Sequence, residues 1–342
     1  MNSNTIISRW LMAIMSLIII IIVVGAITRL TNSGLSMPFW DLIEIFPPIS
    51  ESDWDDKFEE YKNNSTPDSK EQSISEISDF KTIFWWEYIH RILGRIIGLA
   101  ALIPLAIFIY KGYLNYRQKR DYGIILLLII TQGIVGWLMV KSGLNADVYN
   151  SSKGVSPFWL LIHLSLAFST FCYTLFQYLK LKYLDLVNKV DSVINPGIVI
   201  FLVIFIQILL GALMSGFKAA YLYPSFPLME GEFYSSDIIL FKFDNLAFIN
   251  FAHRWFAFIV LATIIAIYYK LLGRMSPSQK NIFAGLLYAV SFQIGLGILS
   301  LLNPVIPFQG GVAQIVLAVF HQFGAIILLS VSTILLFSFN NK

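Results

Sequence analysis

Eight apolar runs, each long enough to cross a bilayer as a helix, dominate this chain. They cover residues 10–28, 87–110, 122–140, 157–179, 196–214, 249–270, 282–301 and 312–337. Hydrophobic residues make up 57% of the 342 residues and charged residues only 13%, which is typical of a membrane protein. We therefore expect an all-α integral membrane protein whose transmembrane helices pack against one another and against lipid.

Basic residues gather in alternate loops and predict the orientation of the chain. They follow the second, fourth and sixth runs: Lys111, Arg117, Lys119, Arg120, Lys180, Lys182, Lys189, Lys270, Arg274 and Lys280. The positive-inside rule places these loops and both termini in the cytoplasm. The first run is too long for a signal peptide and lacks a cleavage site, so we expect a retained helix. No transit peptide precedes it, which favours a bacterial plasma (inner) membrane, with lipid and no nucleic acid as a partner.

The loop between the first two runs, about residues 30–85, is acidic. Residues 40–85 hold twelve Asp and Glu against four Lys. Such charge-rich segments are usually solvated or disordered, so we expect an outer loop without chemistry. Cys172 is the only cysteine, which excludes a disulfide or a cysteine metal site within one chain.

The chain also contains an internal repeat. The second run carries EYIHR at residues 87–91, and the sixth carries NFAHR at 250–254. The third and seventh runs carry QGIVG at 132–136 and QIGLG at 293–297. An even number of crossings per half gives both halves the same orientation, so a pseudo-twofold axis would run along the membrane normal. We expect two homologous four-helix bundles, which divide the chain into residues 1–190 and 191–342.

All four histidines of the chain lie in apolar runs: His90, His163, His253 and His321. An ionisable side chain inside a membrane is costly and indicates function by default. A satisfied core histidine explains any one of them well, but it explains a set of four poorly. They lie on the even-numbered helices, in the outer half of the bilayer, so that the two of each bundle can face each other across a flat ligand.

Haem fits such a pair better than zinc, because zinc usually takes more than two protein ligands. Each histidine is followed four residues later by Gly or Ala, which leaves room for a porphyrin but also serves close helix packing. Arg91, Arg95 and Arg254 lie beside the histidines and could bind haem propionates or reach towards lipid headgroups. A haem iron in each bundle would then be ligated by that bundle's own histidine pair.

Glu87 marks a difference between the two halves. It precedes His90 by three residues, whereas the matching position before His253 is Asn250. A carboxylate beside one pair only suggests that the N-terminal bundle performs chemistry and that the C-terminal bundle holds a cofactor. The alternative is that Glu87 is an interfacial residue in contact with water.

The stretch from Glu87 to Arg95, Glu-x-x-His-Arg-x-x-Gly-Arg, together with the duplicated histidines, resembles the haem A synthase family over nearly the whole chain. The family oxidises the C8 methyl group of haem O to a formyl group, giving haem A for terminal oxidases. The resemblance implies that His90 and His163 flank the substrate haem and that Glu87 is needed for the oxidation. His253 and His321 would be the axial ligands of a haem b cofactor. The chain lacks the outer cysteine pair of some family members, so it resembles the cysteine-free branch found in proteobacteria and mitochondria.

Two other functions stay open at this point. A di-haem b-type electron carrier, such as a quinol oxidoreductase, also needs paired histidines, but it would have four equivalent ligands and no lone carboxylate. A transporter with duplicated halves would show helices broken near the membrane midplane. Pathway logic further suggests contact with haem O synthase and terminal oxidase assembly factors, and self-association stays open.

Overall fold

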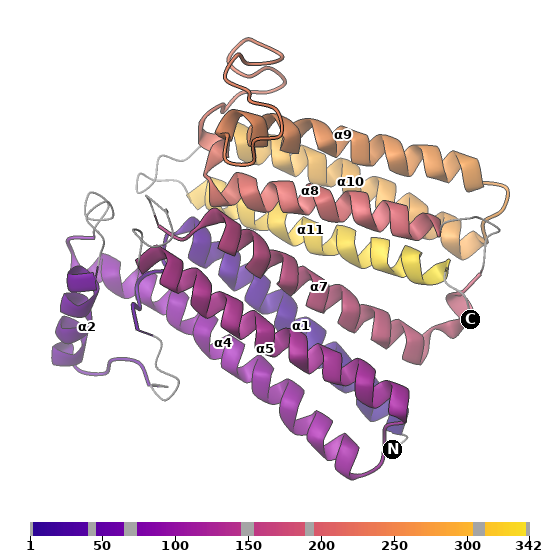
Figure 1. Ribbon diagram of the computed structural model, residues 1–342, viewed down its shortest axis with the longest axis horizontal. Helices are drawn as coiled ribbons and strands as arrows, with labels where there is room; N and C mark the ends of the chain where they lie inside the picture. The colour runs from indigo at the N-terminus through magenta and orange to yellow at the C-terminus, as the bar shows by residue number, and fades with distance from the viewer. Residues whose placement is uncertain are drawn as a thin grey trace. The chain divides into compact units, whose positions relative to one another are not determined.

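The computed structural model describes residues 3–39, 46–64, 74–144, 154–188, 195–303 and 312–339. Within these ranges, eight helices are long and apolar enough to cross a membrane (Figure 1). They are α1 (Ser3–Leu30), α4 (Ile77–Tyr110), α5 (Tyr116–Leu144), α7 (Pro157–Lys182), α8 (Pro196–Gly216), α9 (Leu246–Leu271), α10 (Pro277–Leu302) and α11 (Val312–Ser338). Each contains one predicted run, so the all-α prediction with eight spanning helices is confirmed for the described part of the chain.

Three of these helices begin at polar residues that satisfy free backbone N–H groups. Asn195 caps α8 ahead of Pro196, and Asn245 caps α9 by accepting a hydrogen bond of 2.7 Å from a backbone N–H three residues on. Ser276 and Gln279 form a capping box at the start of α10. These side chains accept hydrogen bonds that the first helical turn cannot make internally. The helix starts are therefore readable in the sequence.

The chain divides into two compact units, one of residues 16–167 and one of residues 168–342 together with the first fifteen. In the second unit, α8 packs against α9 and α11, and α10 packs against the same two helices, which closes a four-helix bundle (Figure 1). Its interior is aliphatic, with side chains at most 1% exposed on all four helices: Ile200, Ile204, Ile264, Leu286 and Leu329. A long connection, residues 217–245, joins α8 to α9 at one end of this bundle and includes the short helix η2 (Ala219–Tyr221).

In the other unit, α4 packs against α5, and a short helix, α2 (Glu51–Asn64), packs against the start of α4 (Figure 1). Helix α2 begins with a capping box in which Ser50 and Asp53 bond to each other's backbone N–H groups. Hydrogen bonds from the backbone N–H groups of Ser50 and Ile49 lower the pKa of the Asp53 carboxyl group. The charge-rich loop expected here therefore contains a helix, and the expectation of a wholly solvated segment is wrong for residues 51–64.

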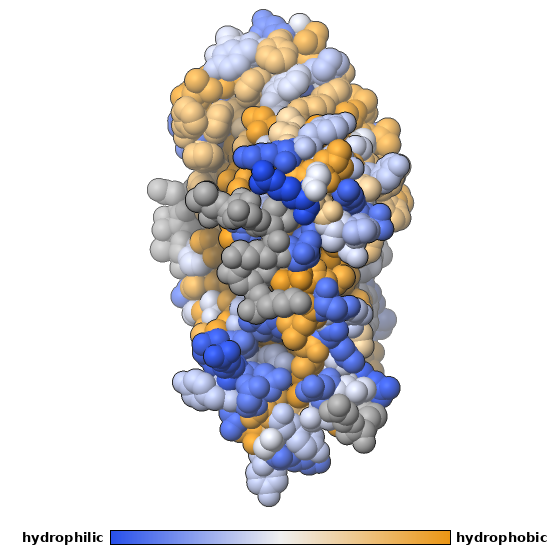
Figure 2. All heavy atoms as spheres, turned by 90° about the vertical axis from the view of Figure 1, so that its right-hand side faces the viewer, coloured by the Kyte–Doolittle hydropathy of each residue, from blue (hydrophilic) through white to orange (hydrophobic). Residues whose placement is uncertain are grey.

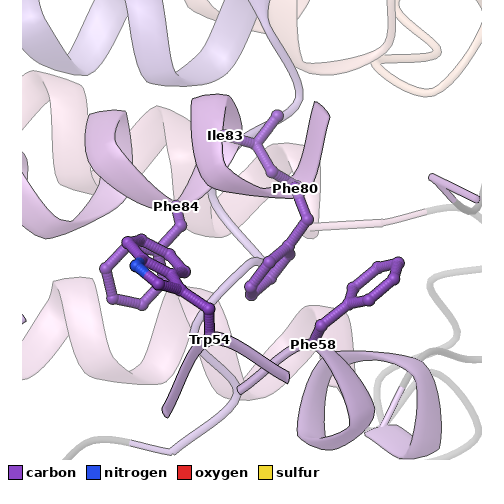
Figure 3. Packing of buried hydrophobic residues seen from close by; sticks show 5 residues of the cluster. All are labelled: Trp54, Phe58, Phe80, Ile83 and Phe84. Atoms are coloured by element: carbon purple, nitrogen blue, oxygen red, sulfur yellow. The ribbon is translucent and has the colours of Figure 1, made fainter. Parts of the chain in front are cut away.

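Aromatic packing holds α2 in place. Trp54 and Phe58, four residues apart on one face of α2, pack against Phe80, Ile83 and Phe84 of α4 (Figure 3). The rings of Trp54 and Phe84 meet edge to face at 5.0 Å between centroids. This contact explains why α4 begins ten residues before the predicted apolar run. Its first turns bury aromatic residues against α2 and expose polar ones such as Asp79 to water.

The outer surfaces of the long helices are apolar, as contact with lipid requires. On α4, for example, Leu99, Leu102, Ile103 and Ile107 are all exposed. Figure 2 looks onto the side where α9 is joined to α10 and shows hydrophilic residues interspersed with apolar ones. Basic residues occur at that connection: Lys270, Arg274 and Lys280.

Candidate functional site

The four histidines lie in two pairs, as the sequence predicts. The rings of His90 on α4 and His163 on α7 are 6.4 Å apart between centroids and inclined at 57°. Those of His253 on α9 and His321 on α11 are 6.3 Å apart and inclined at 86°. Each pair joins two helices of its own unit. All four rings are half-buried.

The spacing of both pairs fits two imidazoles on opposite sides of one metal. Metal–imidazole bonds of about 2 Å each place the two ring centres roughly 6 Å apart. Among the described residues, no group of three or more His, Cys, Asp or Glu could hold an ion alone. A metal held here would need its other ligands from a larger group, and a porphyrin supplies four nitrogens of its own. The donor set therefore fits a haem in each pair.

Each histidine ring lies against a glycine of a neighbouring helix. A Cβ atom added at Gly136, Gly211 or Gly297 would come within 2.9–3.0 Å of the Cε1 atom of the facing histidine. At Gly25 the atom met would be Nε2 of His90, at 3.2 Å. Any side chain at the first three positions would displace the imidazole. These glycines therefore set the depth to which each ring sits between the helices.

A glutamine that sequence reasoning did not single out as a site residue contacts three of the four histidines. The Nε2 atoms of Gln132, Gln207 and Gln293 lie 3.1, 3.2 and 3.1 Å from Nδ1 of His163, His253 and His321. That of Gln132 also lies 3.2 Å from Nε2 of His163. The same atoms donate to the backbone carbonyl of that histidine at 3.0, 2.9 and 2.6 Å. In each case the glutamine precedes the glycine under the ring by four residues. The recurring spacing Gln-x-x-x-Gly is the signal that could have revealed them.

Glu87 is buried, at 3% exposure, and both of its oxygens are engaged. Oε2 accepts hydrogen bonds from the hydroxyl group of Ser36 at 2.8 Å and from the backbone N–H of Met37 at 3.0 Å. Oε1 pairs with the guanidinium group of Arg91 at 2.5 Å. The structure thus shows Glu87 in a buried ion pair that binds the segment after α1, rather than facing water.

The two arginines that follow His90 and His253 have a shared role in the structure. Arg91 donates to the backbone carbonyls of Met37 and Phe39, in the segment that follows α1. Arg254 likewise donates to two carbonyls, two residues apart, in the connection that follows α8: those of Tyr223 and Ser225. In both units, the guanidinium group next to the histidine therefore holds the adjoining connection in place through hydrogen bonds to its backbone carbonyls.

The charge around these two arginines differs. Arg254 is only 7% exposed and has no carboxylate partner among the described residues, and its Nε atom is buried without a hydrogen bond. Asn250, where the other half has Glu87, donates instead to the carbonyl of Ala219 at 2.8 Å. Arg95 lies one turn beyond Arg91 on α4 and is half-buried. The C-terminal site therefore carries a buried positive charge that its own side chains do not neutralise.

Comparison with known proteins agrees with this geometry. Residues 8–333 match the COX15-CtaA family, described as cytochrome oxidase assembly protein. A heme A synthase of Flavobacterium psychrophilum is 37% identical, covering 99% of this chain and 100% of its own length. Heme A synthases of Nitrosospira multiformis and Pelagibacter ubique are each 36% identical, covering 94% and 97% of this chain and 90% and 96% of their own. The chain belongs to the COX15-CtaA family of cytochrome oxidase assembly proteins.

Proposed function

We propose that this protein is a haem A synthase, a membrane oxidoreductase that converts the C8 methyl group of haem O to a formyl group. The observation that carries the proposal is the pair of histidine sites, each spaced for one haem, in a chain that matches heme A synthases over almost its full length. In balance, the methyl group and one water give the formyl group, while two equivalents of an external two-electron acceptor each take up two electrons and two protons. Side chains cannot remove electrons from an unactivated methyl group, so a bound haem supplies the redox chemistry.

The two sites have different roles, one holding a cofactor and the other binding the substrate. His253 and His321 hold haem b as a permanent cofactor in the C-terminal four-helix bundle. His90 and His163 flank the substrate haem in the N-terminal half. The two halves, residues 1–190 and 191–342, are homologous. The repeated geometry of histidine over glycine and of arginine on loop carbonyls supports this relation.

The uncompensated charge of Arg254 supports a propionate at the C-terminal site. A buried guanidinium group needs an anion close by, and a propionate forms charge-assisted hydrogen bonds with it. Arg254 uses two of its five N–H donors on the connection after α8, so its Nε–H stays available. Arg91 is already paired with Glu87, so Arg95 and the remaining donors of Arg91 would bind a propionate of the substrate haem.

Glu87 acts in the oxidation. Its carboxylate lies one helical turn from His90 and adds negative charge to the N-terminal site only. Because the ion pair with Arg91 cancels most of this charge, the role we assign to the carboxylate is to accept one of the protons released as the methyl group is oxidised. Its bonds to Ser36 and Met37 also hold the segment after α1 across the site, so water is excluded and the substrate is positioned.

The protein works in a bacterial plasma membrane, with both termini in the cytoplasm and both haem sites towards the outer side. Basic residues at the predicted cytoplasmic loops support this orientation. Haem O reaches it from the lipid phase or directly from haem O synthase, and haem A leaves towards terminal oxidase assembly. The two rival functions are not favoured. The carboxylate in one site only argues against a simple di-haem carrier, and α4 runs through Pro104 without the break that a transporter would need.

The decisive test identifies the pigments bound to the full-length protein. We would purify it from cells that make both haem b and haem O, extract the porphyrins and determine their masses. Haem b together with haem O or haem A supports the proposal. Two equivalents of haem b with neither haem O nor haem A would instead indicate a di-haem electron carrier. A colourless protein would refute haem binding altogether.

A further inference from the structure

Three of the four histidines share one arrangement, and the fourth departs from it in two independent ways. In the shared arrangement, a glutamine and a glycine four residues apart hold the ring between them: Gln132 and Gly136, Gln207 and Gly211, Gln293 and Gly297. The position four residues before Gly25, the glycine under His90, is Ile21. Ile21 lies against α4 beside His90, because its Cδ1 would be 3.9 Å from a Cβ added at Gly94. Ile21 is therefore the apolar residue at the sequence position that carries the amide in the other three cases.

The His90 ring is also turned differently. The other three rings present Cε1 to their glycine, whereas His90 presents Nε2 and Cδ2 to Gly25, at 3.2 and 3.5 Å from an added Cβ. Within the described part of the chain, no hydrogen bond to the His90 ring is found. Packing alone therefore sets its orientation. A ring held only by packing rotates more easily than one that is also hydrogen-bonded.

The glutamines have the chemistry needed to prepare a histidine for ligation. A neutral imidazole that binds a metal through Nε2 carries its proton on Nδ1, and that proton needs an acceptor. The Oε1 atoms of Gln132, Gln207 and Gln293 are all buried without a hydrogen-bond partner. A half-turn of each amide, together with a shift away from the histidine carbonyl that its nitrogen now contacts, would let Oε1 accept a hydrogen bond from Nδ1–H. The histidine carbonyl that loses the amide bond lies inside a helix and keeps its bond to the N–H four residues on.

We propose that Gln132, Gln207 and Gln293 are positioning residues that hold His163, His253 and His321 ready for ligation. His90, which lacks such a glutamine, is the one releasable ligand. This inference rests on the proposed function. It gives the C-terminal site two firmly held ligands and the N-terminal site only one. A site that must receive, oxidise and release its haem benefits from a ligand that can turn away. The site of a permanent cofactor gains nothing from such a ligand.

The test compares haem binding and haem spectra of the purified full-length protein and its variants. Gln207→Leu and Gln293→Leu should weaken haem b binding by about 10- to 100-fold, the usual effect of losing a hydrogen-bond partner of a metal-ligating histidine. They should also shift part of the haem b from the low-spin to the high-spin spectrum. Gln293→Glu keeps an acceptor, so it should retain low-spin haem b, with a lower midpoint potential because the ligand becomes more basic. A purely structural role would not move the potential in that direction.

Two further variants complete the test. Ile21→Gln should supply the missing amide and raise the low-spin fraction and the haem affinity of the N-terminal site, whereas Ile21→Leu should leave both unchanged. Gln177→Leu is a matched control, since Gln177 is a buried glutamine on α7, about 21 Å along the helix from His163 at ~1.5 Å per residue. If the variants at 207 and 293 bind haem b as the Gln177 variant does, the inference is wrong although the protein still binds haem. A wild-type protein that takes up no haem would overturn the proposed function and this inference together.

Discussion

The N-terminal and C-terminal histidine sites are built on the same plan and differ in what surrounds it. Both place two rings 6.3–6.4 Å apart and fasten the adjoining connection with an arginine. The C-terminal site adds a glutamine to each ring and leaves the positive charge of Arg254 unpaired. The N-terminal site adds a carboxylate and supports only one ring with an amide. In the proposed function, a few polar substitutions let one copy of the scaffold hold a haem permanently and the other copy process one.

The connections over the two sites differ as well. Over the N-terminal site, α2 packs an aromatic cluster onto the first turns of α4 (Figure 3). Over the C-terminal site, the connection after α8 folds around Tyr223, Met229 and Ile238, which pack against the start of α9. Tyr223 bonds through its hydroxyl group to Ser235 and Asp237 and through its carbonyl to Arg254. Both connections therefore bury apolar residues beside the arginine that fastens them.

The largest expected effect comes from removing a ligand. His253→Ala should abolish the low-spin haem b spectrum completely, because the remaining imidazole cannot form a bis-histidine site. His90→Ala should leave that haem b spectrum intact. Absorption spectra of the two purified variants, recorded in the reduced state, check this. Retained haem b in His253→Ala with loss in His90→Ala would reverse our assignment of the two sites.

Substituting the carboxylate should separate chemistry from binding. We expect Glu87→Gln to slow formation of haem A by roughly 100-fold or more, the usual range for losing a group that transfers protons. Its haem b content should stay that of the wild type. Conversion of haem O to haem A, followed by chromatography of extracted porphyrins, measures this. Equal loss of both haems would show that Glu87 is structural only.

The effects of substituting the glycines that contact the histidine rings should follow their contact distances, with the shortest contact giving the largest loss. Gly211→Ala places a Cβ within 3.0 Å of His253, and we expect a loss of about 1–3 kcal/mol in stability or an equivalent loss of haem affinity. Gly25→Ala, with its nearest atom at 3.2 Å, should have a smaller effect. Gly285→Ala is the control, since nothing lies within 4 Å of an added Cβ there. Thermal unfolding in detergent and haem titration give the order, and an equal effect of all three variants would contradict it.

The smallest expected effect tests the charge difference. Asn250→Asp places a carboxylate four residues before Arg254, as Glu87 stands before Arg91. It should neutralise the arginine and weaken haem b binding by about tenfold, or ~1.4 kcal/mol. Asn250→Ala removes the hydrogen bond to Ala219 without adding charge, so it separates the two causes. If the Ala variant binds haem b as weakly as the Asp variant, the charge of Arg254 does not contribute to binding.

Much of the fold could be predicted because the local sequence of each transmembrane segment determines whether it forms a helix. Eight apolar runs become eight helices, since backbone groups in hydrocarbon must be satisfied within their own segment. The histidine pairs also follow from the chain, because alternate helices run parallel and carry their histidines at matched depth. The sequence did not predict α2. Its apolar face has only a few residues, Trp54 and Phe58 among them, within a strongly charged segment.

The surroundings of the histidines depended on tertiary structure. Gln207 and His253 are 46 residues apart, and Glu87 meets Ser36 across 51. No local preference links such partners, because each contact exists only where two helices or a helix and a connection approach closely. The chain alone therefore specified which segments become helices and which of them carry imidazole. Helix packing then determined which imidazoles acquired an amide, and His90 has none because the residue four before its glycine is Ile21.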